Sequence, residues 1–196
     1  SNVDLSGKDL TGANLSNTNL QQADLTNMNL SGANLTGANI TDSNLSNTNL
    51  INTNLTKSNL SSTNLSGANI SGAKLYETKF LDTDFRNVDI ANLDFSGLNL
   101  NGANLSNSYG IYSTILTGAN LSQANLAETD LRNHDLTNTN LSGANLKNSY
   151  LNNSILTGAD LTYSLLTEAR FTGSNFQEAD LRFANFSDTN WNSYDF

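Results

Sequence analysis

The sequence predicts an all-β fold, a solenoid with four short segments in each coil. Three observations indicate this. Large apolar residues recur at every fifth position, small residues lie two positions before them, and Gly or Asn often lies two positions after them. The chain has 196 residues with only 37% hydrophobic content, so the regular spacing of the apolar residues, and not their number, provides the core.

The large apolar residue of each pentad is called its centre. Centres run every fifth residue from Leu5 to Leu105 and again from Ile111 to Phe196, and every one is Leu, Ile, Phe or Trp. On an α-helix, successive centres would step about 140° and scatter around the axis. On a flat strand they would alternate between the two faces. The chain must therefore turn once in each pentad.

Glycine marks where the turn lies. Of the 13 glycines, all except Gly110 lie two residues after a centre, and Asn takes that position in many other pentads. Gly and Asn best tolerate the positive φ of a tight turn. With corners near 90°, four pentads close one square coil of about 20 residues, and about ten coils stack at the strand spacing of about 4.8 Å. Centres and small residues then face inward.

The repeated phrase resembles a known family. Segments such as Ala13-Asn14-Leu15 and Ala119-Asn120-Leu121 are similar to the A-[N/D]-L-x-x phrase of the pentapeptide-repeat proteins. The resemblance implies a right-handed quadrilateral β-helix and covers residues 1–196 as a single domain. The repeat is in register from the first residues, which leaves room for a preceding segment. The repeated residues are structural, so they say little about function.

The register slips by one residue near Gly110. The segment SNSYGI matches KNSYL of a later coil after one insertion, and Gly110 is the extra residue. A bulge at a corner explains this. A recognition loop is the alternative, although such a loop would ordinarily be longer.

The stretch 74–98 is the least regular. Val88, Leu93 and Leu98 fill inward positions that are elsewhere small, and Phe replaces Leu at several centres. The densest outward charge of the chain lies here, and it forms a candidate partner-binding patch: Lys74, Tyr76, Glu77, Lys79, Asp82, Asp84, Arg86 and Asp89. The alternative is a compensated core beneath an ordinary solvated surface.

The sequence predicts no catalytic, cofactor-binding or metal site. The one histidine, His134, falls in an inward position, and no Cys is present, so a neutral buried imidazole is expected. Carboxylates lie at dispersed outward positions, without the buried pairing that tunes acid–base chemistry. We therefore expect a protein that is not an enzyme and needs no cofactor.

The C-terminal end is rich in aromatic residues. Those considered as an end-on interface or as a plug of the open coil are Phe176, Phe186, Trp191, Tyr194 and Phe196. A plug and an end-on homodimer are both compatible with this pattern.

The charge restricts the partners. A net charge of −9 argues against direct nucleic-acid binding, which requires clusters of Lys and Arg. No apolar run approaches the about 20 residues that span a bilayer, and no signal segment is evident, so a cytoplasmic location without membrane contact is expected.

Three functions remain open from the sequence. The first is a non-enzymatic scaffold with an unknown protein partner. The second rests on the resemblance to Qnr-type quinolone-resistance proteins, which implies an acidic DNA mimic that binds a type II topoisomerase such as gyrase. A third is that the Ser and Thr columns order water or ice.

Overall fold

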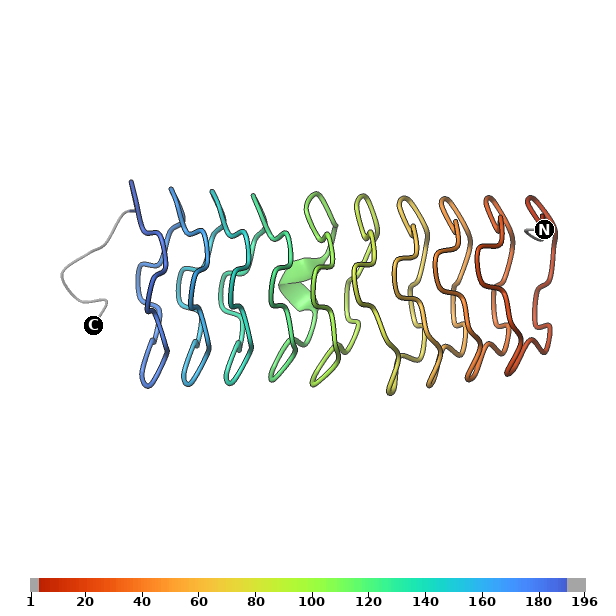
Figure 1. Cartoon of the computed structure of the whole chain (residues 1–196), viewed down its shortest axis with the longest axis horizontal. Helices are drawn as coiled ribbons and strands as arrows, with labels where there is room; N and C mark the ends of the chain where they lie inside the picture. Colours follow the sequence, from red (N-terminus) through yellow and green to blue (C-terminus); the bar gives the residue numbers. More distant parts are fainter. Residues whose placement is uncertain (1–3, 190–196) are drawn as a thin grey trace.

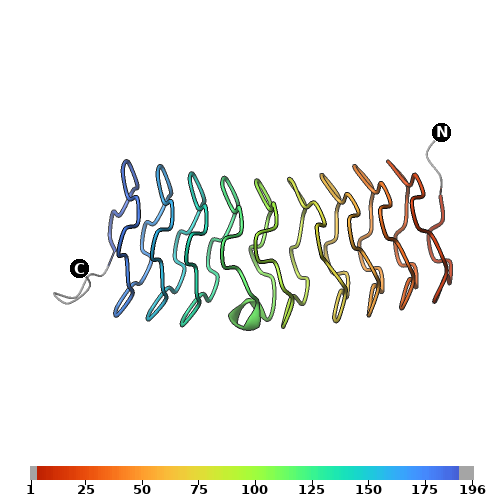
Figure 2. The same cartoon turned by 90° about the horizontal axis from the view of Figure 1, so that it is seen from below.

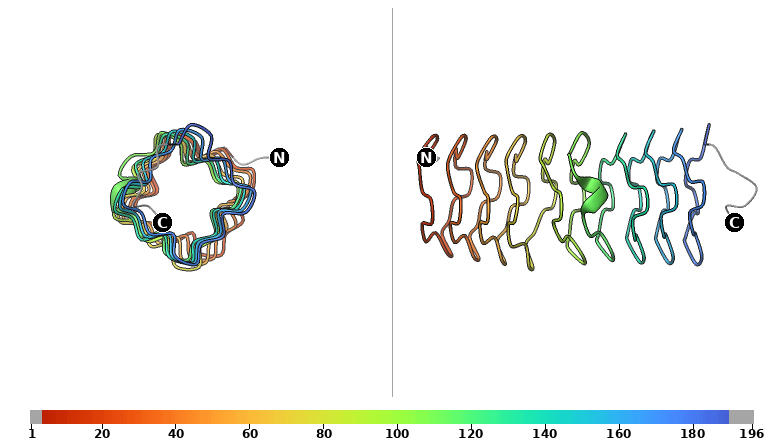
Figure 3. Two further views of the ribbon diagram at one scale, coloured as in Figure 1. Left: turned by 90° about the vertical axis from the view of Figure 1, so that its left-hand side faces the viewer. Right: turned by 180° about the vertical axis from the view of Figure 1, so that it is seen from behind.

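The computed structural model describes residues 4–189, and it shows a four-sided rod of stacked coils (Figure 1). The view along the axis shows the coils superimposed with four corners (Figure 3). The fold is the right-handed quadrilateral β-helix that the sequence predicted.

Each wall is built from single parallel bridges and not from long strands. The residue before a centre pairs with its counterpart 20 residues later, as in Asn14 with Asn34 and Asn34 with Asn54. A two-residue turn joins successive bridges. In nearly every turn the N–H of the next small residue donates to the carbonyl of the centre, as from Ala13 to Leu10 at 3.0 Å.

The second turn residue has a positive φ whatever its side chain is. The angle is 66° at Gly32, 60° at Lys57 and 58° at Tyr163. Because every corner needs this conformation, the stacked coils impose it even on residues that disfavour it. The preference for Gly and Asn is therefore a tendency of the sequence and not a requirement.

The core runs along the axis of the rod. Centres such as Leu35 and Leu121 are fully buried, and so are small residues such as Ala33. Inward hydroxyls donate to backbone carbonyls, as Thr53 Oγ1 does to Leu30 at 2.8 Å and Ser58 Oγ to Leu55 at 2.6 Å. The polar members of the core are thus compatible with burial.

The extra residue, Gly110, lies at a corner of its coil. Gly110 has φ 72° and precedes a single 3₁₀ turn, η1 (Ile111–Ser113), which stands out at the edge of the rod in Figure 2. Bridges that cross it span 21 residues, as in Asp94 with Ile115. The insertion is therefore a short turn that keeps the wall in register and not a projecting loop. No helix among residues 4–189 is long and apolar enough to cross a membrane.

Candidate functional site

The polar side chains of the regular walls form hydrogen bonds with one another and with the backbone of their own turns. The Asn64 side chain accepts a hydrogen bond from the Ser66 N–H at 2.9 Å and donates to Asn44 Oδ1 in the adjacent coil at 3.2 Å. Outward hydroxyls also bond within their own turn, as Ser61 does to Asn59 at 2.6 Å. The amides face outward, at the position directly before a centre. They are half-buried turn caps, and the Asx-turn spacing was the signal for this role.

The structure distributes the residues of the candidate patch around one coil. Lys74 lies on the third face, which is the wall that carries residues 14, 34, 54, 74, 94 and 115 at its outward bridge positions. Tyr76 and Glu77 occupy the next corner, and the other members follow around the remaining walls: Lys79, Asp82, Asp84, Arg86 and Asp89. The patch is thus a belt, and only part of it shares a face with Lys74.

Two interactions join members of the belt. Arg86 Nη2 lies 2.6 Å from Asp84 Oδ2. Burial would raise the pKa of Asp84, but hydrogen bonds from Arg86 outweigh it and lower this pKa, while the same contact raises the pKa of Arg86. At the corner that follows Lys74, the hydrogen bond to Glu77 raises the pKa of Tyr76. Glu77 also lies 3.8 Å from Lys57 of the preceding coil.

A cluster of three phenylalanines lies beneath the belt. The ring centroids of Phe80 and Phe85 are 5.2 Å apart, and Phe95 lies 5.8 Å from each of them in an edge-to-face arrangement. Val88 and Leu93 are also buried. The core is therefore bulkier here than in coils built from Leu and Ala.

The third face opens next to this cluster. Within residues 4–189, no bridge joins Lys74 to Asp94. Asn54 of the preceding coil nevertheless pairs with Lys74, and Asp94 pairs with Ile115 of the following coil. A cavity of about 670 Å³ lies between the two coils. We call this opening the slot, and it is lined by residues 72–76 and 92–94 together with Thr56, Ser96 and Leu98.

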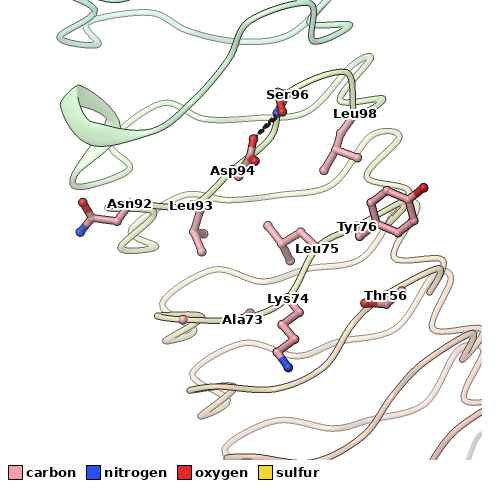
Figure 4. A pocket seen from close by; sticks show the side chains of 11 residues that line it. Thr56, Ala73, Lys74, Leu75, Tyr76, Asn92, Leu93, Asp94, Ser96 and Leu98 are labelled. Carbon is pink, nitrogen blue, oxygen red and sulfur yellow. Dashed lines mark hydrogen bonds between the residues drawn. The ribbon is translucent and has the colours of Figure 1, made fainter.

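The close-up shows how the slot is built (Figure 4). Leu75, Leu93 and Leu98 point to its interior side, and Asn92 and Tyr76 lie at its two ends. Ala73 and Leu98 are only partly buried although they take inward positions in the middle of the rod. The apolar core is therefore accessible from the side at this one wall.

A second break in the ladder lies beside η1. In the part of the chain that the structure describes, Tyr109 does not pair with Asp130, nor Ile115 with Asp135. A cavity of about 350 Å³ in this region is lined in part by Tyr112 and by the residue that the sequence analysis singled out, His134.

His134 is buried, as the sequence analysis expected. Its Nε2 donates to the Ile111 carbonyl at 2.6 Å and lies 3.5 Å from Thr114 Oγ1. Its Nδ1 has no hydrogen-bond partner within residues 4–189. No group of three His, Cys, Asp or Glu residues that could hold a metal ion occurs in this described range.

Two exposed tyrosines of the C-terminal half, Tyr150 and Tyr163, were not singled out by the sequence analysis. Arg170 lies over the Tyr150 ring at 4.9 Å from the centroid, and Tyr163 stacks on Phe183 with centroids 4.9 Å apart. Tyr163 and Phe183 also hold a positive φ. The signal was an aromatic residue at a position that Gly or Asn normally takes.

The aromatic end is described in part. Phe176 and Phe186 are half-buried and pack edge-to-face on Phe171, with centroids 5.5 and 6.1 Å away. They therefore lie on the core axis and not on a side wall. Trp191, Tyr194 and Phe196, which complete the predicted plug or interface, lie outside the described residues.

Comparison with known proteins agrees with this architecture. The family model of pentapeptide repeats matches over residues 1–32, 9–47, 33–72, 43–80, 68–107, 114–153 and 154–190. Among residues 4–189, the family model leaves out 108–113, and this stretch contains the insertion. A comparison with curated proteins found no match.

Two solved structures are similar to this chain over most of its length. One is a trypsin-treated form of QnrB1, a plasmid-mediated fluoroquinolone resistance protein, with 21% identity, coverage of 98% of this chain and 91% of that chain, and a TM-score of 0.51. Another is HetL from the cyanobacterium Nostoc sp. strain PCC 7120, a protein involved in heterocyst differentiation regulation. It has 25% identity, coverage of 95% and 88%, and a TM-score of 0.47. The chain belongs to the pentapeptide repeat family.

Proposed function

We propose that this protein is a non-enzymatic scaffold that binds a protein partner through the part of the belt next to the slot. The observation that carries this proposal is the contrast between the regular and the irregular coils. Asn, Ser and Thr of the regular walls bond to one another, so these walls offer few unsatisfied groups. The long side chains of Lys74, Tyr76 and Lys79 project from the wall instead.

The composition of the belt supports contact with a protein. Tyr76 is 68% exposed, and neither Lys74 nor Lys79 takes part in an ion pair within residues 4–189. Exposed tyrosine beside accessible apolar surface is typical of protein interfaces. An acidic protein with a local group of cations can also select a partner by charge.

The experiment is co-purification from the source cell with tagged variants. We expect that Lys74→Ser/Lys79→Ser loses proteins that the wild type retains. The control, Lys8→Ser/Lys147→Ser, also removes two positive charges from exposed positions and should retain them. Equal recovery with both double variants would show that the belt is not the binding surface.

The acidic DNA mimic has less support from the charge distribution. Asp84, Asp130 and Asp180 each lie 2.6 Å from the Arg two residues later, so these carboxylates present little net negative charge. Duplex DNA carries one charge per about 1.7 Å. A gyrase supercoiling assay tests the mimic, and inhibition at micromolar protein would favour it over the scaffold.

A further inference from the structure

The two edges of the slot carry backbone groups that the regular wall would pair. In the wall below, Leu55 N–H donates to the Lys74 carbonyl and Lys74 N–H donates to Thr53, both at 2.9 Å. The same rule would join Leu75 N–H to the Asp94 carbonyl and Asp94 N–H to the Ala73 carbonyl. Neither bond is present among residues 4–189.

The coils on either side of the slot are nevertheless held in the ladder. Above it, Ile115 N–H donates to Leu93 at 3.0 Å and Phe95 N–H donates to Ile115 at 2.9 Å. Both edges are thus fixed by their outer neighbours, and their facing groups are open at the third face. The slot is an interruption between two ordered coils.

Side-chain volume explains the interruption. The position of Leu93 holds Thr or Ala in the coils below, at Thr53 and Ala73. In this coil Leu93 packs in a core that also holds Phe80, Phe85 and Phe95. Interiors are close-packed, so extra volume must displace the backbone. The wall separates at its third face, where Leu93 and Phe95 on either side of Asp94 are both large.

Lys74 and Asp94 give an independent sign of the separation. Charges of opposite sign at neighbouring coil positions form ion pairs elsewhere in the rod, as Lys57 does with Glu77 and Lys147 with Glu168, both at 3.8 Å. Lys74 and Asp94 are 20 residues apart, as Lys57 and Glu77 are, but no ion pair joins them in the described part of the chain.

The chemistry of the slot restricts what can occupy it. Its floor is apolar, with Ala73, Leu93 and Leu98, and its lower rim presents an acceptor at Ala73 and a donor at Leu75. A strand edge with open donors and acceptors is the usual template for addition of an extended peptide. Such a peptide provides both hydrogen bonds from a single residue.

We propose that the slot binds an extended segment of a partner polypeptide, which adds to the wall at Lys74 in the position that Asp94 would take. One partner residue donates its N–H to the Ala73 carbonyl and accepts from the Leu75 N–H. Because side chains alternate along a strand, the next residue points inward and places an apolar side chain on Leu93 and Leu98. This inference rests on the proposed scaffold function and names the form of the partner.

The test is selection from a phage-displayed library of random twelve-residue peptides on the wild-type protein. Synthetic copies of the enriched peptides are then titrated against three variants. Tyr76→Ser changes the end of the slot, and Leu93→Ala removes the bulk of its floor. Tyr112→Ser is the matched control, because Tyr76 and Tyr112 are 68% and 70% exposed and both follow a centre directly.

We expect enriched peptides to share one apolar residue, and replacing it with Asp should abolish binding. Leu93→Ala should weaken binding by about tenfold, Tyr76→Ser should weaken it by several fold, and Tyr112→Ser should leave it unchanged. N-methylation of the peptide residue that pairs with Lys74 removes its donor and should also weaken binding by about tenfold. In NMR spectra, the amide signal of Leu75 should shift on titration.

Three results would overturn the proposal: no enrichment, equal binding to Tyr76→Ser and wild type, or tolerance of N-methylation at every peptide position. Tyr76 is a surface residue, so its variant remains informative even if Leu93→Ala fails to fold. The scaffold function is judged separately. If cellular partners depend on Lys74 and Lys79 but bind Tyr76→Ser and Leu93→Ala normally, the slot is wrong and the scaffold stands.

Discussion

Where Asn stands directly before a centre, its side chain links the turn that follows to the adjacent coil. Its Oδ1 closes the turn that follows, and its Nδ2 reaches the Asn one coil away, as Asn64 does with Ser66 and Asn44. The repeated amides thus form ladders along the rod. Such ladders add cooperativity between coils because each amide is both donor and acceptor.

Removing one amide should destabilise the protein measurably. We expect Asn64→Ala to lower the free energy of unfolding by about 1 kcal/mol, the usual effect of losing a side-chain cap. Asn64→Ser keeps a hydroxyl that can accept from the Ser66 N–H and loses the donor to Asn44, so it should cost less. Urea unfolding of both variants measures this difference, and an equal cost would mean that the turn bond contributes nothing.

In some pentads Asp stands directly before the centre, where other pentads have Asn, and these carboxylates make the stability of the fold depend on pH. Hydrogen bonds from Arg132 lower the pKa of Asp130, and those from Thr137 lower the pKa of Asp135. A lowered folded-state pKa means that these carboxylates stabilise the fold above the unfolded value of about 3.9. Their contribution is lost as the pH falls through the folded-state value.

Urea unfolding at several pH values tests this dependence. Stability should decline as the pH drops below about 4. Asp130→Asn keeps an acceptor for the Arg132 N–H and does not titrate, so its decline should be smaller than that of the wild type. Superimposable pH profiles would show that the Arg132 contact does not act through the protonation of Asp130.

At the scale of the coil, the insertion near Gly110 shows what the sequence could and could not predict. The slip was visible because centres shift from Leu105 to Ile111, and Gly110 was identified as the extra residue. The contact behind it was not visible. A Cβ at Gly110 would lie 2.7 Å from the Ala91 nitrogen of the preceding coil, which depends on how two coils stack.

A matched pair of substitutions separates that contact from backbone strain. Gly97 and Gly110 have φ of 65° and 72°, but a Cβ at Gly97 meets nothing within 4 Å. Gly97→Ala should therefore cost about 1 kcal/mol, the left-handed strain alone. Gly110→Ala should cost about 2 kcal/mol more, because backbone atoms must also move. Thermal or urea unfolding gives both values, and equal costs would contradict the close approach.

The rest of the fold also divides into features that the repeat predicts and features that depend on how the coils stack. Centres, small residues and turns follow from a period of five, so coil number and inward positions could be predicted from residues such as Leu35 and Ala33. The slot could be anticipated only as an irregular stretch. Large inward residues at Leu93 and Leu98 were evident, but which wall would open depends on how their volume is shared with Phe80, Phe85 and Phe95. The residues of the candidate patch form a belt around one coil, because neighbours in sequence turn onto different walls.

At the scale of the whole rod, stability comes from contacts between adjacent coils. In such linear repeats each coil contacts only its neighbours, so a weak junction can separate regions that open independently. The rod has two interrupted junctions in residues 4–189: the slot between Lys74 and Asp94, and the break beside η1. They lie near the middle and divide the rod into two regular parts.

Hydrogen exchange should reveal this division. Amides that pair across intact junctions, such as Leu35 with Asn54 and Leu146 with Leu165 at 2.8 and 2.7 Å, should exchange slowly. The Leu75 amide should exchange at least about tenfold faster, although the Leu75 side chain is only 6% exposed, because protection follows the free energy of local opening and not side-chain burial. Mass spectrometry of peptic fragments or NMR measures these rates.

The Leu93→Ala variant gives the decisive comparison. With less core volume the two coils can approach, so the Leu75 N–H can reach the Asp94 carbonyl and the exchange of the Leu75 amide should slow. Unchanged exchange at Leu75 in a folded Leu93→Ala protein would mean that something other than core volume holds the junction open.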